Sequence, residues 1–403
     1  MDKNTLIGFL LIGAILIGFS ILNQPTDEEI ARNKHYNDSI ALVEQNRIEQ
    51  QAAQLKQKNT ATTVDSLLIA TASDTSSLVD MYGAFGPSAQ GEEKFITLEN
   101  ELVKLSISTK GGFIKSAQLK NFQTHDSLPL ILFEKDESSM NFNLVTNNNR
   151  VVSTSNMYFE PVGKVTTDSI GNQQLIMRLK TNTEAFIDFK YVLPKNNYML
   201  SFSLKANAMN QVLPASLNSL EMQWASKIRQ QEKGIQFEDR YSQIHYKFVA
   251  DDVETLSATS DEEKKIPNKV KWIGFSGQFF STILIANDAF TSTILTSKRE
   301  IENSGYLKSY KSDVSVAFDP TGQNETSFRM YLGPNQYKVL SSYDKDLKSE
   351  DKLLLRKIIP LGWGIFGWVN RFMIIPMFNF FSTFVDNFGI IILLMTLVIK
   401  LLL

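Results

Sequence analysis

The chain lacks cysteine altogether and has only three histidines among its 403 residues. The absence of cysteine excludes disulfide bonds, thiol catalysis, cysteine-bound metals and lipid attachment to an N-terminal cysteine. No His-Glu-x-x-His pattern, phosphate loop or dinucleotide fingerprint is present either. We therefore expect no enzyme activity, no metal and no cofactor, and a cysteine-free chain is compatible with export to the periplasm.

An excess of charge of either sign is also missing. The chain has 41 lysines and arginines against 43 aspartates and glutamates, which gives a formal net charge of −2. Proteins that bind nucleic acid carry clustered positive charge, and no basic patch stands out here. The composition therefore argues against nucleic acid as a partner, whereas 43% hydrophobic residues are enough to bury a core.

Long hydrophobic runs are scarce, and the first covers residues 6–22. These seventeen residues carry no charge, and no small-x-small cleavage pattern follows them. The run is longer than the hydrophobic part of a typical signal peptide, so we predict an uncleaved transmembrane anchor over residues 1–25. Because Lys3 lies beside Asp2, the charge bias is weak evidence for orientation. We place the N-terminus in the cytoplasm mainly because a large polar part of the chain follows the anchor.

The second run is GIIILLMTLVIKLLL at residues 389–403, interrupted only by Thr396 and Lys400. As a helix it would be about 22 Å long, short of the roughly 30 Å hydrocarbon core. We therefore expect the chain to end inside a second membrane span. Lys400 would lie about 16 Å along this helix, where an ammonium costs on the order of 3 kcal/mol. It either faces a polar cavity or partner, or it snorkels to the headgroups of a simple anchor.

The segment between the two runs changes character twice. Residues 26–90 are rich in Ser, Thr, Asn, Gln and acids, which predicts a flexible polar tether. From residue 91 to 342 the hydrophobic period becomes two, with turns at Gly111-Gly112 and at 194–197. Alternation with one polar face predicts antiparallel sheets, and we interpret this part as a large β-sandwich. The predicted strands include 102–109, 113–120, 141–146, 173–180, 187–193, 198–204, 272–286, 290–297, 314–318 and 330–332, with an exposed loop at 251–265.

Residues 343–388 are predicted to connect the sandwich to the second hydrophobic run. Residues 343–357 suggest a short charged helix that ends before Pro360. The following stretch, 366–385, is rich in aromatic residues and almost uncharged, which is typical of a helix in the headgroup layer of a membrane. A continuous extension of the membrane helix is the alternative, which Pro376 disfavours. The candidate membrane-interface residues are Trp363, Trp368, Arg371, Phe372 and Pro376.

Candidates for other chemistry are few. Ser276 follows Gly274 and Phe275, but the sequence lacks the second spaced glycine of a nucleophile elbow, so an ordinary strand or turn residue is favoured. His245 lies near Glu238 in the sequence and could serve as a general base in a cleft, although a surface or structural histidine is favoured. Two tryptophans of the sandwich, Trp224 and Trp272, are core or cleft aromatics.

Four pieces of the sequence resemble the YidC family of bacterial membrane-protein insertases. They are the uncleaved N-terminal helix, Ser108-Thr109-Lys110-Gly111-Gly112 at the start of the sandwich, Tyr331-Leu332-Gly333-Pro334 at its end, and the stretch from Leu361-Gly362-Trp363-Gly364 through Lys400. In the last piece Pro376, Asn387, Gly389, Thr396 and Lys400 match positions of the family's interfacial helix and second membrane helix. The resemblance covers essentially the whole chain.

The resemblance implies a periplasmic supersandwich similar to that of sugar mutarotases, without known enzyme activity. It also implies a hydrophilic groove built by five membrane helices, with one basic residue inside. Lys400 matches that basic position, where arginine is common, and Thr396 is a candidate for lining the groove. Four of the five helices would lie beyond Leu403. The implied function is insertion and folding of membrane proteins in the bacterial inner membrane.

Partners follow from the same resemblance. They are nascent membrane proteins, the Sec translocon with its accessory subunits, the ribosome through the parts beyond Leu403, and the lipid bilayer. The alternative function is a membrane-anchored periplasmic module that binds carbohydrate or protein, and a weaker one is a scaffold for other envelope proteins. Further hydrophobic segments beyond Leu403 would support the insertase, whereas an immediate stop codon would support the anchored module.

Overall fold

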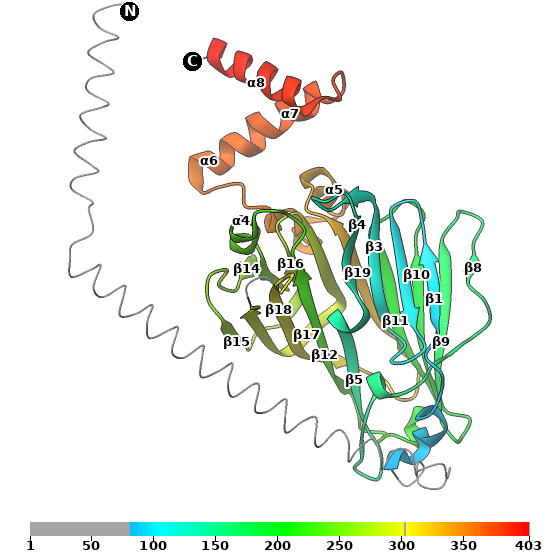
Figure 1. The fold of residues 1–403 in the computed structure, drawn as a ribbon. Helices are drawn as coiled ribbons and strands as arrows, with labels where there is room; N and C mark the ends of the chain where they lie inside the picture. Colours follow the sequence, from blue (N-terminus) through cyan, green and yellow to red (C-terminus); the bar gives the residue numbers. More distant parts are fainter. Residues whose placement is uncertain (1–80, 302–303, 403) are drawn as a thin grey trace, which may run out of the picture. The chain divides into compact units, whose positions relative to one another are not determined.

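The computed structural model describes residues 81–301 and 304–402. The predicted anchor at 6–22 and most of the predicted tether lie outside these residues. The described part is dominated by antiparallel strands, with short helices before and after them (Figure 1). The strands are β1 (Phe95–Glu99), β2 (Val103–Ser108), β3 (Ile114–Gln123), β4 (Pro129–Glu134), β5 (Ser138–Val145), β6 (Val151–Ser153), β7 (Glu160–Pro161), β8 (Thr166–Thr167), β9 (Gln173–Lys180), β10 (Phe186–Leu193), β11 (Met199–Asn207), β12 (Ser219–Arg229), β13 (Gln243–Phe248), β14 (Val253–Thr255), β15 (Glu262–Ile266), β16 (Val270–Ser276), β17 (Phe280–Arg299), β18 (Tyr306–Ala317) and β19 (Thr326–Pro334).

The helices are short. They are α4 (Ile235–Arg240), α5 (Tyr337–Ser342), α6 (Gly364–Val369), α7 (Ile375–Phe381) and α8 (Phe388–Leu402), with a π-helical segment at Asn370–Ile374. Single 3₁₀ turns lie at Gly83–Ser88, Lys135–Glu137, Thr154–Asn156, Met209–Gln211, Ser349–Asp351 and Leu355–Ile358.

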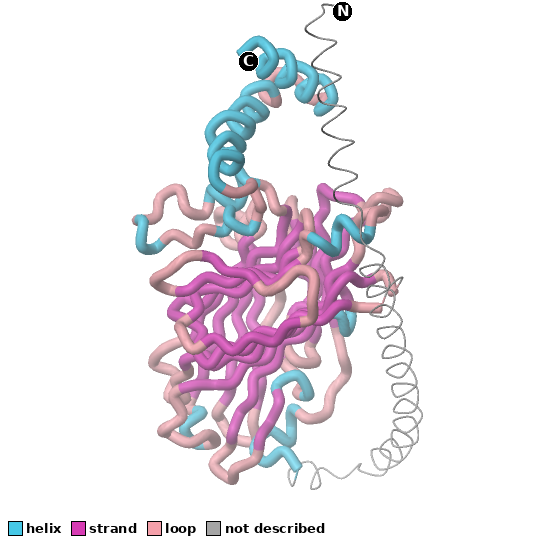
Figure 2. Tube along the Cα trace, turned by 90° about the vertical axis from the view of Figure 1, so that its left-hand side faces the viewer, coloured by secondary structure: helices cyan, strands magenta, loops and turns pink. Residues whose placement is uncertain are grey.

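The strands form a four-stranded sheet, β1-β2-β3-β4, and a 15-stranded sheet whose main order is β6-β5-β12-β18-β17-β19-β11-β10-β9-β7. The larger sheet curls, so that its two ends face each other across one core. Phe142 of β5 contacts Phe189 of β10 with ring centroids 5.6 Å apart, and Phe202 of β11 at 6.4 Å. The strands consequently lie in stacked layers (Figure 2). The predicted mainly-β sandwich is confirmed.

Strand β17 joins the two halves of the curled sheet. Its first part, 280–286, pairs with β19, and its last part, 291–299, pairs with β18. At the start of the last part the register shifts between Thr291 and Ile294, and Ser292 has a left-handed backbone with φ of 49°. A bulge of this kind bends a strand and increases its twist. One long strand therefore turns the corner of the sandwich, where the sequence predicted two strands.

The Gly111-Gly112 turn has a steric cause. Gly112 has φ of 66°, and a Cβ there would lie 2.9 Å from the ring of Phe159. Its carbonyl oxygen accepts a hydrogen bond from the Tyr191 hydroxyl at 2.6 Å. Because only glycine adopts this conformation without strain, the turn brings the four-stranded sheet close to β10.

Three sequence predictions are corrected. The predicted loop at 251–265 contains the edge strands β14 and β15. The predicted helix at 343–357 is instead an irregular segment with two 3₁₀ turns, because its leucines pack onto the sandwich: Leu353 and Leu355 are fully buried. The end of the predicted tether also packs onto the domain, since Phe85 is buried and the Ser88 hydroxyl donates to the Lys180 carbonyl.

Candidate functional site

Residues 364–381 run through α6, the π segment and α7 without an intervening turn. The π segment directly precedes Pro376, which lies in the first turn of α7. Proline has no N–H and its ring crowds the carbonyl four residues earlier, so a helix widens or kinks there. The sequence predicted a helix at 366–385, and the structure has one over residues 364–381 with an irregular middle.

The surface of this helical stretch is overwhelmingly apolar. Only Asn370, Arg371 and Asn379 are polar among residues 364–381. Trp363, just before α6, is 81% exposed, and both Trp368 and Phe372 are 61% exposed, with Arg371 and Pro376 exposed beside them. Large aromatic side chains at this exposure form a surface that water does not favour, and one typical of membrane or protein contact. The structure thus brings the predicted interface residues onto one short stretch of helix.

Helix α8 carries the predicted groove residues. The Asn387 side-chain oxygen accepts hydrogen bonds from the N–H groups of Gly389, at 2.9 Å, and Ile390, and so caps the start of the helix. Ile391 and Met395 are buried, and α8 contacts α7. Within residues 81–301 and 304–402, no helix is both long and apolar enough to cross a bilayer.

Lys400 and Thr396 lie one turn apart on α8. Both are exposed and are about 40° apart around the helix axis. The Thr396 hydroxyl donates to the Ile392 carbonyl at 2.8 Å, so its hydrogen-bonding need is met within the helix. Lys400 lies about 140° around the axis from Met395, away from the α7 contact. A polar stripe of two side chains therefore faces outward from an otherwise apolar helix.

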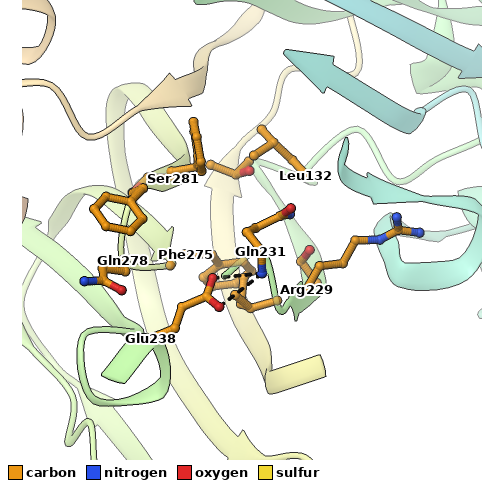
Figure 3. A pocket seen from close by; sticks show the side chains of 13 residues that line it. Leu132, Arg229, Gln231, Glu238, Phe275, Gln278 and Ser281 are labelled. Atoms are coloured by element: carbon orange, nitrogen blue, oxygen red, sulfur yellow. Dashed lines mark hydrogen bonds between the residues drawn. The ribbon is translucent and has the colours of Figure 1, made fainter. Parts of the chain in front are cut away.

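The sandwich contains a small cavity between β12, α4 and the β16–β17 turn (Figure 3). Its volume is about 30 Å³, enough for one or two water molecules and too small for a sugar ring. Glu238 is 2% exposed, and its carboxylate accepts the backbone N–H groups of Gln231 and Glu232 at 3.0 Å. Burial raises the pKa of Glu238, and these two N–H donors oppose that shift. This carboxylate holds a loop in place.

The remaining catalytic candidates occupy structural positions. His245 is 3% exposed on β13, and burial lowers its pKa to about 4. The buried Ser276 hydroxyl accepts a hydrogen bond from the hydroxyl of Ser281, another serine, at 2.9 Å. Trp224 and Trp272 are fully buried, so neither ring offers a stacking surface to a ligand. These residues form no triad.

One polar pocket was not predicted from the sequence. It lies on the outer face of β10, β11 and β19 and is lined by Lys190, Ser201, Ser203 and Arg329. These residues occupy the polar positions of the period-two pattern, which we interpreted only as a solvated face. An arginine among small hydroxyl residues on neighbouring strands was the available signal.

A family of sequences described as the YidC periplasmic domain matches residues 95–376 of this chain. The chain belongs to this family. The YidC match begins at the first residue of β1 and ends inside α7, and thus includes the sandwich, α6 and the π segment. The predicted family and the predicted periplasmic domain are confirmed.

Relatives named "Membrane protein insertase YidC" align with the whole chain. The protein from Parabacteroides distasonis is 45% identical over 405 residues, which covers 100% of this chain and 63% of that protein. The protein from Bacteroides fragilis strain ATCC 25285 is 40% identical and is covered to 61%. The chain therefore spans somewhat less than two thirds of the length of these YidC relatives.

Solved structures are more distant in sequence. A crystal structure titled "Active YidC insertase crystal structure with the first transmembrane domain resolved" is 12% identical with a TM-score of 0.35, and the alignment covers 85% of this chain and 62% of that one. A putative aldose 1-epimerase from Escherichia coli K12 is 10% identical with a TM-score of 0.36, covering 60% of this chain and 100% of that one.

Proposed function

We propose that this chain serves in the insertion and folding of nascent membrane proteins in the bacterial inner membrane. The observation that carries the proposal is Lys400, an exposed cation one turn from Thr396 on an otherwise apolar helix, in a chain whose relatives are named membrane protein insertases. An ammonium at membrane depth is costly unless water or a partner reaches it. Such a hydrated cation would attract acidic tails of substrates.

The mechanism that we propose involves no bond chemistry. A hydrophilic groove containing Lys400 would shorten the distance that the polar tail of a substrate must cross in hydrocarbon. The apolar helix of the substrate would then move along the open side of the groove into lipid. Thr396, bonded within α8, would line this groove without needing a partner from another helix.

The proposal also assigns each part of the chain a position relative to the membrane. The exposed aromatic side chains of Trp363, Trp368 and Phe372, with Arg371, would hold the α6–α7 stretch in the headgroup layer. The sandwich would lie in the periplasm and the N-terminus in the cytoplasm. On the family resemblance alone, we also propose the Sec translocon with its accessory subunits and the ribosome as partners.

The domain organisation that we propose follows the same placement. An N-terminal transmembrane anchor over residues 1–25 and a polar tether would lead into the sandwich. After the sandwich, an interfacial helix would lead into a membrane helix that begins near residue 389.

The test is substitution of Lys400 in the full-length protein. We expect Lys400→Leu to abolish insertion of a reporter with an acidic periplasmic tail, measured by protease protection, and Lys400→Arg to retain it because the charge stays. Lys298→Leu makes the same change at an exposed lysine of β17 in the sandwich, is the matched control, and should insert the reporter nearly as well as the parent. Insertion at the parent level by Lys400→Leu, at equal membrane abundance, would refute the role of the cation.

A further inference from the structure

The outer face of β10, β11, β19, β17 and β16 is only partly covered. Residues 337–358, which we call the strap, lie over one part of it: the Trp272 indole N–H donates to the Leu353 carbonyl at 2.7 Å, and Leu340 and Ile358 are buried. Trp272 pairs with Ile285, which pairs with Arg329, so these side chains project from the same face. Beside the strap this face forms a pocket of about 310 Å³.

Arg329 lines this pocket without a bound acid. Among the described residues its guanidinium has no hydrogen bond or ion pair, although the residue is only partly exposed, and burial lowers its pKa. Other partly buried arginines of the sandwich bind carboxylates: Arg178 donates to Asp188 at 2.7 Å and Arg229 to Glu137 at 2.7 Å. Removing a guanidinium from water is unfavourable unless an anion or acceptor compensates it. No acid or hydrogen-bond acceptor among the described residues compensates the guanidinium of Arg329 in this way.

The neighbours of Arg329 increase the positive potential of the pocket. Lys190 lines it, and Lys271 lies close enough to repel Arg329, with its ammonium donating to the backbone carbonyls of Asn287 and Asp288. Hydrogen-bond donors are available as well, since the Ser201 and Ser203 hydroxyls line the same wall.

One acid belongs to the pocket. Glu325 is exposed at its rim, and its carboxylate accepts a hydrogen bond from the Ser327 hydroxyl at 3.3 Å. The lining has two cations, Lys190 and Arg329, and this one anion, so its net charge is +1. This balance suits a singly charged group better than a doubly charged phosphate.

We propose that this pocket binds a carboxylate, held by the guanidinium of Arg329, the ammonium of Lys190 and the hydroxyls of Ser201 and Ser203. A planar guanidinium matches the two oxygens of a carboxylate in a bidentate pair. The carboxylate belongs either to a free organic acid or to an acidic side chain of a polypeptide that lies beside the strap. This site is independent of the insertase role proposed above.

Calorimetric titration of the purified chain in detergent, at constant ionic strength, tests the site. The probes are butyrate, the blocked peptide acetyl-Gly-Glu-Gly-amide and inorganic phosphate. We expect saturable binding of a carboxylate probe, weakened about tenfold or more by Arg329→Gln, because a charge-assisted bidentate pair is lost. Glu325→Gln should tighten binding, because it removes the negative charge at the rim. Butyrate as the tighter ligand indicates a free acid, and the peptide as the tighter ligand indicates a polypeptide.

Two further variants secure the result. Lys298→Gln removes an exposed charge from β17 outside the pocket and should bind like the parent. Ser201→Tyr fills the pocket without changing its charge and should abolish binding, which keeps the test valid if Arg329→Gln fails to fold. The proposal is overturned if the parent binds neither carboxylate probe, if the folded Arg329→Gln or Ser201→Tyr variant binds like the parent, or if phosphate binds more tightly than both carboxylates.

Discussion

His245 is a buried base that the fold keeps neutral. Burial lowers its pKa from 6.5 to about 4, so between these values the unfolded chain takes up a proton that the folded chain does not. The contribution of neutral His245 to stability is complete above pH 6.5 and falls as the pH drops towards 4. At 1.36 kcal/mol for each pKa unit, the loss amounts to about 3 kcal/mol.

We therefore expect His245→Leu to reduce the acid sensitivity of the fold. The free energy of unfolding, measured by urea denaturation at pH 7 and pH 4.5, should fall less in the variant than in the parent. Other titrating groups are common to both proteins, so the difference between them reports on His245. Equal losses in parent and variant would show that this histidine titrates normally in the folded state.

Individual residues differ in how well the sequence revealed them. Lys400 was found because a charge inside an apolar run is conspicuous. Arg329 was missed, because alternation shows which face of a strand is polar but not which polar side chains from separate strands meet. The burial of His245 was missed for a related reason, since β13 is covered on both faces and carries no clear alternation.

At the scale of an element, the strap depends on one acid. Asp344 is 4% exposed and accepts the N–H groups of Leu353 at 2.6 Å and Leu354 at 2.9 Å, together with Arg356 at 3.2 Å. Leu354 has a left-handed backbone with φ of 56°, which is unfavourable for leucine. Asp344 thus stabilises a strained turn that places Leu353 and Leu355 in the core.

Removing this acid should loosen the strap. We expect Asp344→Ala to lower the free energy of unfolding by about 3 kcal/mol, because two buried N–H groups lose their acceptor. Urea denaturation followed by circular dichroism measures the change. Asp346→Ala, at an exposed position two residues later, is the matched control and should change stability by about 0.5 kcal/mol or less. A similar small change for Asp344→Ala would contradict the anchoring role.

The depth of the α6–α7 stretch in a bilayer can be measured with the fluorescence of its own tryptophans. Trp363 and Trp368 are exposed, whereas Trp224 and Trp272 are buried in the sandwich. In vesicles with brominated lipids, we expect bromines near the headgroups to quench more fluorescence than bromines near the chain ends, because the proposed position of the helix is in the interface. The double variant Trp363→Phe and Trp368→Phe should lose this quenching. Stronger quenching from the chain ends would indicate a helix that enters the hydrocarbon.

Elements with strong periodicity were predicted well. The bounds of β9 agree with the prediction, and β10, β11 and the turn between them were found. The predicted division of residues 272–297 into strands was wrong. The real turn, at 277–279, contains neither Pro nor Asn and was not recognised. Asn287 and Asp288 are typical turn residues, but β17 continues through them. Whether a strand continues through such residues depends on its pairing with other strands, which a single sequence does not display.

On the scale of the whole molecule, the sequence predicted the class of fold but not its closure. Alternating strands indicate sheets with one solvated face, yet they do not show which strands are neighbours. The curled sheet depends on β17 pairing with β19 through one half and with β18 through the other. Its closure also depends on a core shared by β5, β10 and β11. These contacts join residues far apart in the chain, so local patterns carry little information about them.

The short connection between the strap and α6 limits how far the sandwich can move. Ile358 is buried in the domain, and α6 begins only six residues later at Gly364. A fully extended connection of that length reaches about 20 Å. On the placement of α6 among the headgroups proposed above, the end of the sandwich that carries Ile358 would stay within about 20 Å of the headgroup layer. A protein that binds this end of the sandwich would then have to reach it close to the outer surface of the inner membrane.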